Sequence, residues 1–209
     1  MGSDDPELLG RWRAGESAAG EMLFERYYPA VTRFFANKVA GDPADLIQET
    51  FMACLHGRDR VVEAGRFRSY LFGIAYNVLR QHYRRQRVAG ERFDDARATA
   101  ADVSPGPTTM MGETAEQQLL LAALRRIPIG FQVVLELFYW EEMTSATIAE
   151  VLGEPHGTVR TRLRRARELL EEAMRAASTD ATLFRRTLAD LGRWAADVRV
   201  AHGREPPAT

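Results

Sequence analysis

The stretch TSATIAEVLGEPHGTVRTRLRRARELL, from Thr144 to Leu170, decides the fold of the C-terminal half of the chain. It predicts two helices joined by a short turn, because Thr144 can cap the first helix, Gly153 can end it, and the second can begin around Thr158. The pattern is typical of a helix-turn-helix, in which the second helix enters the major groove of DNA. The predicted buried positions are Ile148, Val151 and Leu152 in the first helix and Val159, Leu163, Ala166 and Leu170 in the second.

The second of these helices has a strongly basic outer face. Five arginines and no acid lie between His156 and Arg167, so these side chains repel one another unless an anion lies opposite. A solvated charged face is the alternative, but the turn favours DNA, because free backbone N–H groups at a helix start near Thr158 can bind phosphate. We expect base contacts from Arg160, Thr161 and Arg165 and phosphate contacts from Thr158, Arg162 and Arg167.

Upstream of this motif, residues 6–87 predict a separate helical domain. Its long first helix carries one apolar stripe at three- and four-residue steps. The Gly-Asp-Pro sequence at 41–43 stops that helix, and Asp42 can cap the next one. The stripe consists of Leu23, Phe24, Tyr27, Val31, Phe34 and Phe35. The next expected elements are a helix over about 44–55, a polar loop over 57–65 and an apolar helix over about 66–87.

The helix over 44–55 combines a buried face with a compact polar patch. Its apolar side chains face inward, which leaves Asp45, Gln48 and Glu49 together on the outer face. Two carboxylates four residues apart on an exposed helix, with no histidine beside them, make a poor acid-base site. We therefore expect either a docking surface for another protein or a plain solvated face.

The helix over 66–87 interleaves aromatic and basic side chains and contains no acid. About half of its aromatic residues are needed for the core, but aromatic faces beside guanidinium groups also bind unpaired bases, at roughly 1–3 kcal/mol per base. We expect this helix to hold a melted DNA strand, with Asn77 reading one base in a pocket. The expected strand-binding residues are Arg68, Tyr70, Tyr76, Asn77, Arg80 and Arg84.

The remaining segments complete the domain organisation. Residues 88–112 contain two prolines, three glycines and many small residues without periodicity, which is typical of a linker. Helical spacing resumes over 113–177, the domain that contains the helix-turn-helix. A C-terminal extension over 178–209 contains a further helix over 178–202, with Trp194 close to its apolar face. The sequence thus predicts an all-α fold: two small helical domains, a flexible linker and a C-terminal helix.

Composition excludes several classes of protein. A chain of 209 residues with a net charge of −1 can bury a core and is not a uniformly basic nucleic-acid coat. Among 28 basic residues only Lys38 is a lysine, which reflects either contacts with phosphates and bases or a genome of high GC content. The single Cys54 and four scattered histidines exclude intramolecular disulfides and argue against a metal site. Without a leader or a membrane-length apolar run, we expect a cytoplasmic protein that needs no cofactor and does not insert into a membrane.

In order and spacing, these motifs resemble those of the bacterial extracytoplasmic-function sigma factors, a compact branch of the sigma-70 family. DLIQETF at 45–51 is similar to the region 2 helix that docks on the β′ clamp helices of RNA polymerase. FRSYLFGIAYNVLRQHYRR at 67–85, with the loop at about 56–65, is similar to the segment that melts the promoter and reads its −10 element. The stretch over 124–170 is similar to region 4, which reads the −35 element. The resemblance covers roughly residues 7–175.

The resemblance implies a non-catalytic initiation factor. It implies binding to core RNA polymerase, through the β′ clamp helices and the β flap, and delivery of that enzyme to promoter DNA. It also implies a linker that threads through the polymerase channel, and an anti-sigma factor or another regulator as a further partner. The implied roles are polymerase contacts for Asp45, Gln48 and Glu49, a place near the flipped −10 base for Asn77, and −35 base contacts for Arg160, Thr161 and Arg165.

Two other functions remain open from the residues alone. One is a stand-alone helix-turn-helix regulator that binds duplex DNA through residues 144–170 without being a polymerase subunit. The other is a nucleic-acid-processing enzyme, for which the adjacent acids Asp94 and Asp95 are an insufficient metal site. The helix over 178–202 lies beyond the resemblance, and it either packs against the second domain or has a regulatory role. Thr147 stands where the family often has an acid, so the capping box is incomplete.

Overall fold

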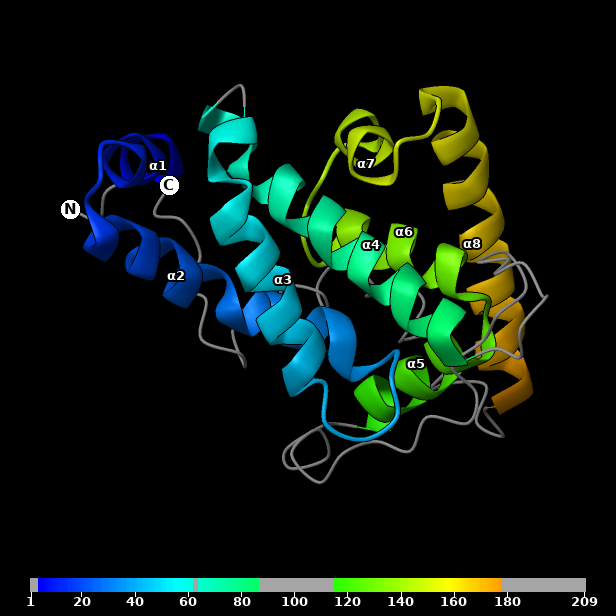
Figure 1. Cartoon of the computed structure of the whole chain (residues 1–209). Helices are drawn as coiled ribbons and strands as arrows, with labels where there is room; N and C mark the ends of the chain where they lie inside the picture. The colour runs from blue at the N-terminus through cyan, green and yellow to red at the C-terminus, as the bar shows by residue number, and fades with distance from the viewer. Residues whose placement is uncertain (1–3, 62–63, 87–114, 178–209) are drawn as a thin grey trace.

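The computed structural model describes residues 4–61, 64–86 and 115–177, which form helices and no β-strand (Figure 1). The N-terminal half consists of α1 (Asp5–Arg13), α2 (Ser17–Ala36), α3 (Ala44–His56), two 3-10 helices (Arg58–Arg60 and Ala64–Arg66) and α4 (Phe67–Gln86). The C-terminal half consists of α5 (Ala115–Arg126), α6 (Ile129–Tyr139), α7 (Ser145–Leu152) and α8 (His156–Ala177). The predicted all-α fold is confirmed. The predicted linker and C-terminal helix lie outside the described residues.

The apolar stripe of α2 forms the centre of the N-terminal half. Leu23, Tyr27, Val31 and Phe35 are at most 2% exposed, as the helical spacing predicts. Phe24 lies at the edge of the stripe, half-buried, and is in edge-to-face contact with Trp12 of α1 at a ring-centroid distance of 5.3 Å. The stripe therefore fixes α1 and the two later helices of this half around one core.

The start of α3 lies where it was predicted, but the cap differs. Pro43 occupies the N-cap position, and the Asp42 carboxylate accepts a hydrogen bond from the Ala44 N–H at 3.0 Å. An aspartate commonly bonds to the backbone two residues further on, and this Asx turn satisfies one free donor at the helix start. The loop predicted over 57–65 contains the first 3-10 helix and most of the second, which ends at Arg66.

The helix-turn-helix is formed by α7 and α8. The Thr144 side chain accepts a hydrogen bond from the Thr147 N–H at 3.1 Å, and Gly153 ends α7 in the left-handed region, at φ 65°. The second helix starts close to the predicted position around Thr158, but the expectation of a free backbone N–H at Thr158 is wrong. The second helix begins at His156, and the Thr158 N–H donates to the Pro155 carbonyl at 2.9 Å.

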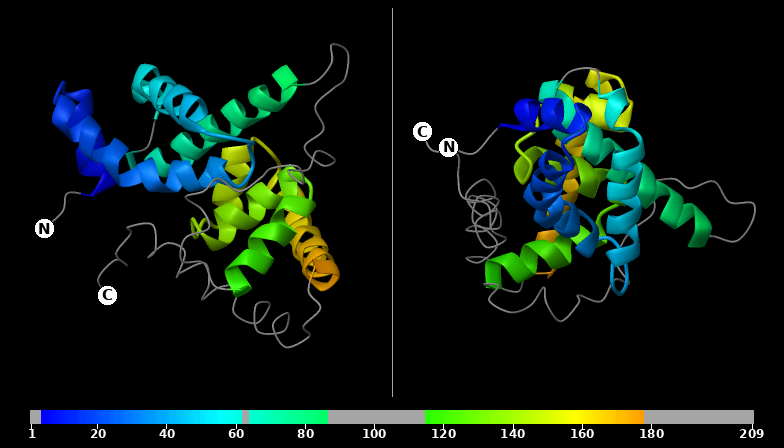
Figure 2. Two further views of the ribbon diagram at one scale, coloured as in Figure 1. Left: turned by 90° about the horizontal axis from the view of Figure 1, so that it is seen from below. Right: turned by 60° about the vertical axis from the view of Figure 1, so that its left-hand side comes forward.

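The two halves pack against each other in the described structure. α4 crosses the middle of the molecule and contacts α3 on one side and α7 on the other (Figure 1). Figure 2 shows the same side-by-side packing from two further directions. Buried apolar residues from both halves belong to one continuous cluster. Among the described residues, no helix has the length and apolarity that a bilayer crossing requires.

Candidate nucleic-acid interface

The recognition helix α8 presents a basic face because its apolar residues fall on one stripe. Val159, Leu163, Ala166 and Leu170 are buried against the rest of the C-terminal half. The opposite face exposes all but one of the predicted DNA-binding residues of this helix. The exposed residues are Thr158, Arg160, Thr161, Arg165 and Arg167, together with Arg164. Predicted base-reading and phosphate-binding side chains therefore share one accessible surface.

Arg165 is exposed but engaged with acids on its own helix. Its guanidinium lies 2.9 Å from Glu168 and 3.6 Å from Glu172. The hydrogen bond to Glu168 raises the pKa of the Arg165 guanidinium, so that it stays fully charged. Exposed ion pairs of this kind contribute little to stability, and Arg165 can exchange Glu168 for a base edge at small cost.

Two other arginines of α8 have structural contacts. The Arg162 side chain is mostly buried, and its guanidinium lies 3.0 Å from Glu154, in the turn before the helix. Arg167 lies over the rings of Phe138 and Tyr139, at 5.2 Å and 5.5 Å from their centroids. The sequence predicted that both arginines bind phosphates. In the structure, Arg162 forms an ion pair with the turn before α8, and the Arg167 guanidinium packs against two rings of α6.

The predicted strand-binding helix, α4, borders a groove of about 530 Å³. Asn77 is exposed on this groove, as a base-reading amide must be. Tyr70 also lines it, and its hydroxyl donates to the Gly57 carbonyl at 2.8 Å. Burial raises the pKa of the Tyr70 phenol, which keeps it neutral and able to donate. The groove is also lined by residues that the sequence did not assign to a strand site, namely Arg60, Arg66 and Ser69 from the N-terminal half and Glu150, Val151 and Leu152 from α7.

The four other residues predicted to bind the strand have different surroundings. Tyr76 is only 3% exposed, so its ring faces the core and offers no free stacking surface in this arrangement. The Arg80 guanidinium covers the Tyr76 ring at 5.6 Å. Arg68 binds Glu141 of the C-terminal half at 2.7 Å. Arg84 is exposed near the end of α4.

The polar patch of α3 lies on the surface, as predicted. Asp45 and Gln48 are exposed, and Glu49 is half-buried with a carboxylate oxygen 3.5 Å from Arg85 of α4. Met52 extends this face and is 45% exposed, one of three large apolar side chains that are exposed in the described part of the chain. Met52 was not predicted as part of this patch, although its spacing of seven, four and three residues from Asp45, Gln48 and Glu49 places it on the same face.

A metal-dependent centre is not apparent in the described part of the chain. Within residues 4–61, 64–86 and 115–177, no three His, Cys, Asp or Glu side chains gather so as to hold a metal ion. The acids Asp94 and Asp95 lie outside these ranges. The described surfaces instead offer guanidinium groups, an exposed amide and hydroxyls, which are the groups that bind phosphates and base edges.

Two regions of the chain match known protein families. Residues 23–88 match the family described as Sigma-70 region 2, and residues 117–170 match Sigma-70, region 4. Together the two matches cover more than half of the chain. The first contains α3 and α4 with their predicted sites, and the second contains the helix-turn-helix.

Individual relatives agree with this assignment. The ECF RNA polymerase sigma factor BldN of Streptomyces coelicolor is 29% identical over 158 residues, which are 74% of this chain and 60% of BldN. The ECF RNA polymerase sigma-E factor of Haemophilus influenzae is 27% identical over 176 residues, 80% of this chain and 93% of that protein. A solved structure of CnrH, in complex with the cytosolic domain of CnrY, shares the fold with a TM-score of 0.62 at 24% identity, covering 83% of this chain and 99% of that one. With both sigma-70 regions present in order on one chain, the protein belongs to the sigma-70 family and is a sigma factor of the extracytoplasmic-function group.

Proposed function

We propose that this sigma factor directs RNA polymerase to its promoters through two DNA-binding surfaces, the outer face of α8 for duplex DNA and the groove beside α4 for a melted strand. The observation that carries the proposal is their presence on one chain: a basic recognition helix in one half and an exposed Asn77 on a groove in the other. The corresponding domains are residues 6–87 and 113–177, joined by 88–112. The protein acts in the cytoplasm with core polymerase and carries out no covalent step.

On α8, Arg160, Thr161 and Arg165 read the bases of the −35 element. Their side chains are exposed in the first three turns of the helix, the part that reaches base edges in the major groove. A bidentate arginine–guanine contact contributes about 1–3 kcal/mol of discrimination. Thr158 and Arg167 bind phosphate, and Arg162 contributes by holding the turn through Glu154.

On α4, Asn77 reads the extruded −10 base. Its amide both donates and accepts hydrogen bonds, which a base edge requires. Tyr70 and Arg84 hold the neighbouring nucleotides, while Tyr76 and Arg80 form the wall behind them. Strand capture favours promoter opening because the trapped single strand is bound more tightly than the duplex.

On α3, Asp45, Gln48 and Glu49 bind the β′ clamp helices, and Met52 adds an apolar contact at one end of that surface. An exposed methionine beside charged and polar side chains is typical of a protein–protein interface. The C-terminal half provides the second contact with polymerase, on the β flap.

Transcription in vitro with core polymerase tests this division of roles. We expect Asn77→Ala to retain binding to core polymerase and to −35 duplex DNA but to lose promoter opening, measured as permanganate reactivity of unpaired thymines. Asp45→Ala should weaken core binding, whereas Glu21→Ala, an exposed acid on α2, should not. If Asn77→Ala opens promoters normally, the groove is not the strand site. If the wild-type chain does not bind core polymerase, the whole proposal fails.

A protein regulator is also part of the proposal. CnrH, which has the same fold, was solved in complex with the cytosolic domain of CnrY. A regulator of this chain would copurify with it in stoichiometric amount from its native host and would inhibit transcription when added back to the purified system. Full activity of the chain with the copurified protein present would contradict this role.

A further inference from the structure

The groove beside α4 has two walls of different chemistry. One wall is a stripe of α4 and the residue before it, since side chains three and four positions apart share one helix face. This stripe consists of Arg66, Ser69, Tyr70, Gly73, Ile74 and Asn77. The other wall is the C-terminal end of α7, at Glu150, Val151 and Leu152. The volume of about 530 Å³ lies within the range of small-molecule sites, about 300–1,000 Å³.

One end of the groove is positively charged. Arg60 and Arg66 both line it, and Arg60 lies near Tyr70, since burial raises the pKa of the Tyr70 phenol and the charge of Arg60 opposes that rise. Arg66 is paired with Glu150 at 2.8 Å, but both side chains are about half exposed, and such exposed pairs contribute little to stability. Two guanidinium groups face one carboxylate here, so this end favours an anion such as a phosphate.

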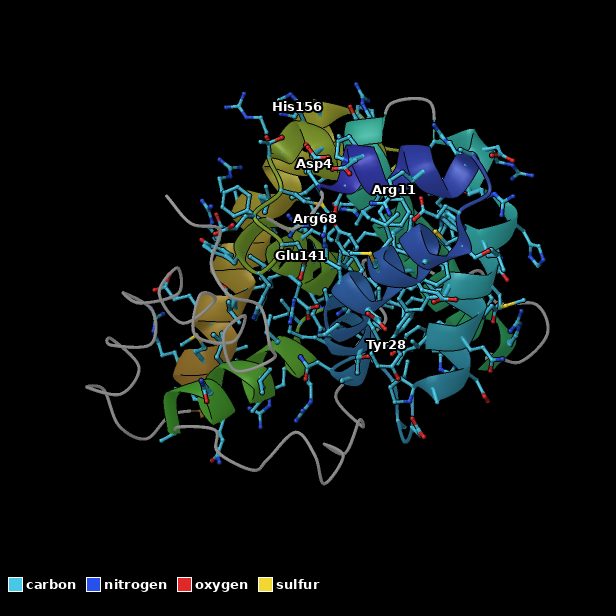
Figure 3. The ribbon with its side chains drawn as sticks, turned by 90° about the vertical axis from the view of Figure 1, so that its left-hand side faces the viewer. Asp4, Arg11, Tyr28, Arg68, Glu141 and His156 are labelled. Carbon is cyan, nitrogen blue, oxygen red and sulfur yellow. The ribbon has the colours of Figure 1, made fainter. Side chains whose placement is uncertain are left out.

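Other charged groups where the halves meet are already paired. Arg68 binds Glu141 at 2.7 Å, and Figure 3 shows these two residues next to each other. Lys38, just after α2, pairs with the buried Glu136 of α6. Arg60 differs from them, because its side chain is exposed on the groove and no ion pair with a described acid engages it. The anion site therefore centres on Arg60.

The opposite end of the groove offers hydrogen-bonding groups. Asn77 lies about three helical turns from Arg66, or roughly 16 Å at about 1.5 Å per residue. Its exposed amide can both donate and accept. One turn back, the Val151 carbonyl approaches α4, since a Cβ added to Gly73 would lie 3.6 Å from that oxygen. This end therefore suits a group that carries both a donor and an acceptor.

The Val151 carbonyl needs a donor from outside its own helix. A helical carbonyl accepts from the N–H four residues further on, but position 155 is a proline, which has no N–H. The Glu154 N–H, one residue nearer, donates to the Ala149 carbonyl at 3.0 Å instead. Because Val151 is buried, its carbonyl is an acceptor that a ligand in the groove can satisfy.

The middle of the groove is apolar and suits a flat ring. Ile74 of α4 and Leu152 of α7 line it from opposite walls, and Gly73 contributes no side chain that would fill it. Adenine presents an exocyclic amine that donates beside a ring nitrogen that accepts, which matches the Val151 carbonyl and the Asn77 amide. Guanine presents a carbonyl oxygen where adenine has the amine, and that oxygen would oppose the Val151 carbonyl.

We propose that this groove binds an adenine nucleotide with at least two phosphates. The base lies at Asn77 and Val151, and the phosphates lie at Arg60 and Arg66. The ribose hydroxyls donate to the Glu150 carboxylate, a contact that carboxylates make in other nucleotide sites. AMP is too short to reach both ends, whereas the second phosphate of ADP extends toward the guanidinium groups. The site rests on the proposed function in one respect, since the nucleotide and the melted strand share the groove and exclude each other.

Isothermal titration calorimetry of the full-length chain with ADP, in the absence of magnesium, tests the site directly. We expect one ADP per chain, and we expect AMP and GDP to bind at least about tenfold more weakly, because each loses a charged or base-edge contact. No binding of ADP at millimolar concentration would overturn the proposal. Equal affinity for ADP, GDP and inorganic pyrophosphate would also overturn it, because such a site recognises phosphates alone.

A variant at the positive end locates the phosphates. Arg60→Gln should weaken ADP binding by about tenfold, because a charge-assisted contact is lost. Arg58→Gln is the charge-matched control, since Arg58 belongs to the same 3-10 helix but lies over the Trp12 ring. Unchanged ADP affinity in folded Arg60→Gln, with folding judged by circular dichroism, would overturn the proposal.

A second variant fills the groove at the base. Gly73→Ala adds one methyl group without straining α4, because its Cβ makes only an ordinary contact and alanine favours a helix. We expect ADP to bind at least about fivefold more weakly, since the methyl group takes the space of the ring. Gly10→Ala in α1, where a Cβ meets no atom within 4 Å, is the matched control. Full affinity of Gly73→Ala for ADP would place the base elsewhere and overturn the proposal.

The nucleotide site and the strand site can fail separately. Binding of ADP by a chain in which Asn77→Ala still opens promoters would overturn the strand site and support the nucleotide site. Promoter opening that depends on Asn77, in a chain that binds no ADP, would overturn the nucleotide site alone.

Discussion

Arg162 and Glu154 form an ion pair of 3.0 Å that joins the recognition helix to the turn before it. Both side chains are about four-fifths buried. A hydrogen bond to a charged, partly buried group contributes roughly 1–3 kcal/mol. We expect Arg162→Ala to lower the free energy of unfolding by about 1–2 kcal/mol, measured by urea denaturation, because it leaves the Glu154 carboxylate unpaired.

A double-mutant cycle separates this structural role from DNA binding. If Arg162 acts by stabilising the turn, Glu154→Ala should also lower the free energy of unfolding. The double variant Arg162→Ala/Glu154→Ala should then lose less free energy of unfolding than the two single variants lose together. If Arg162→Ala leaves stability unchanged but lowers the affinity for every promoter, Arg162 is a phosphate anchor.

The cap of α7 gives a second prediction. The Thr144 hydroxyl accepts from the Thr147 N–H, and the two threonine hydroxyls lie 2.9 Å apart. Thr144→Ala should lower stability by about 1 kcal/mol, because a backbone donor loses its cap. Thr147→Glu should raise stability by a few tenths of a kcal/mol, because it completes the capping box. If Thr144→Ala leaves the free energy of unfolding unchanged in urea denaturation, water replaces the lost cap hydrogen bond.

Gly153 gives a third prediction, since it ends α7 in the left-handed region. Gly153→Ala should lower the free energy of unfolding by about 1–2 kcal/mol. Gly153→Asn should lower it by less, because asparagine tolerates the left-handed conformation. Gly157→Ala is the matched control: that glycine is in the first turn of α8 with open space around its Cα, and alanine should stabilise the helix by about 0.5–1 kcal/mol. Equal effects of alanine at both positions, measured by thermal unfolding, would contradict this assignment.

The helix-turn-helix was predictable because its signals are local. Thr144 and Gly153 mark the ends of α7, and apolar spacing identifies the buried stripe of α8. The start of α8 was predicted two residues late because His156 and Gly157 are not typical helix-starting residues, and a hydrogen bond to the Pro155 carbonyl, not composition, sets that boundary.

The packing between the halves could not be read from local patterns. Lys38 and Glu136 are 98 positions apart, and periodicity within a helix says nothing about which surface it meets. Gln132 and Glu136, two polar residues within the mainly apolar α6, are the trace that this contact leaves in the sequence. Tyr76 is a related case: α4 is packed on two sides, so its pattern cannot separate core aromatic residues from exposed ones.

Stability at alkaline pH gives a fourth prediction. Burial raises the pKa of the Cys54 thiol to about 12, from an ordinary value of 9.0, and the pKa of Tyr83 to about 12, from 10.0. The folded state thus binds these two protons more tightly than the unfolded state, so the contribution of Cys54 and Tyr83 to stability is full below about pH 9 and is lost as the pH rises toward 12. Urea denaturation at a series of pH values should show this decline.

Cys54→Ala tests the thiol contribution to that decline. It should make the loss of stability between pH 9 and 10 shallower, because Tyr83 begins to titrate only at higher pH in the unfolded chain. Cys54 should also resist iodoacetamide at neutral pH until the chain unfolds, since a buried neutral thiol is unreactive. Rapid alkylation of the native chain would contradict the burial of Cys54.

The last prediction concerns the two roles proposed on α8, base reading by Arg165 and phosphate binding by Arg167. Arg165→Ala should change the preference at one position of the −35 element, because a bidentate contact with guanine is lost, at about 1–3 kcal/mol against other bases. Arg167→Ala should weaken binding to all promoters alike and reduce the salt dependence by about one phosphate contact. It should also lower the unfolding temperature slightly, because the Arg167 guanidinium packs on the rings of Phe138 and Tyr139.

The control is Arg175→Ala, on the same helix but far from the turn and paired with Glu171. Binding of holoenzyme to a randomised −35 library at several salt concentrations measures all three variants. A parallel loss for Arg165→Ala and Arg167→Ala on every sequence would mean that neither arginine reads a base, and that the specificity of α8 comes from Arg160 and Thr161.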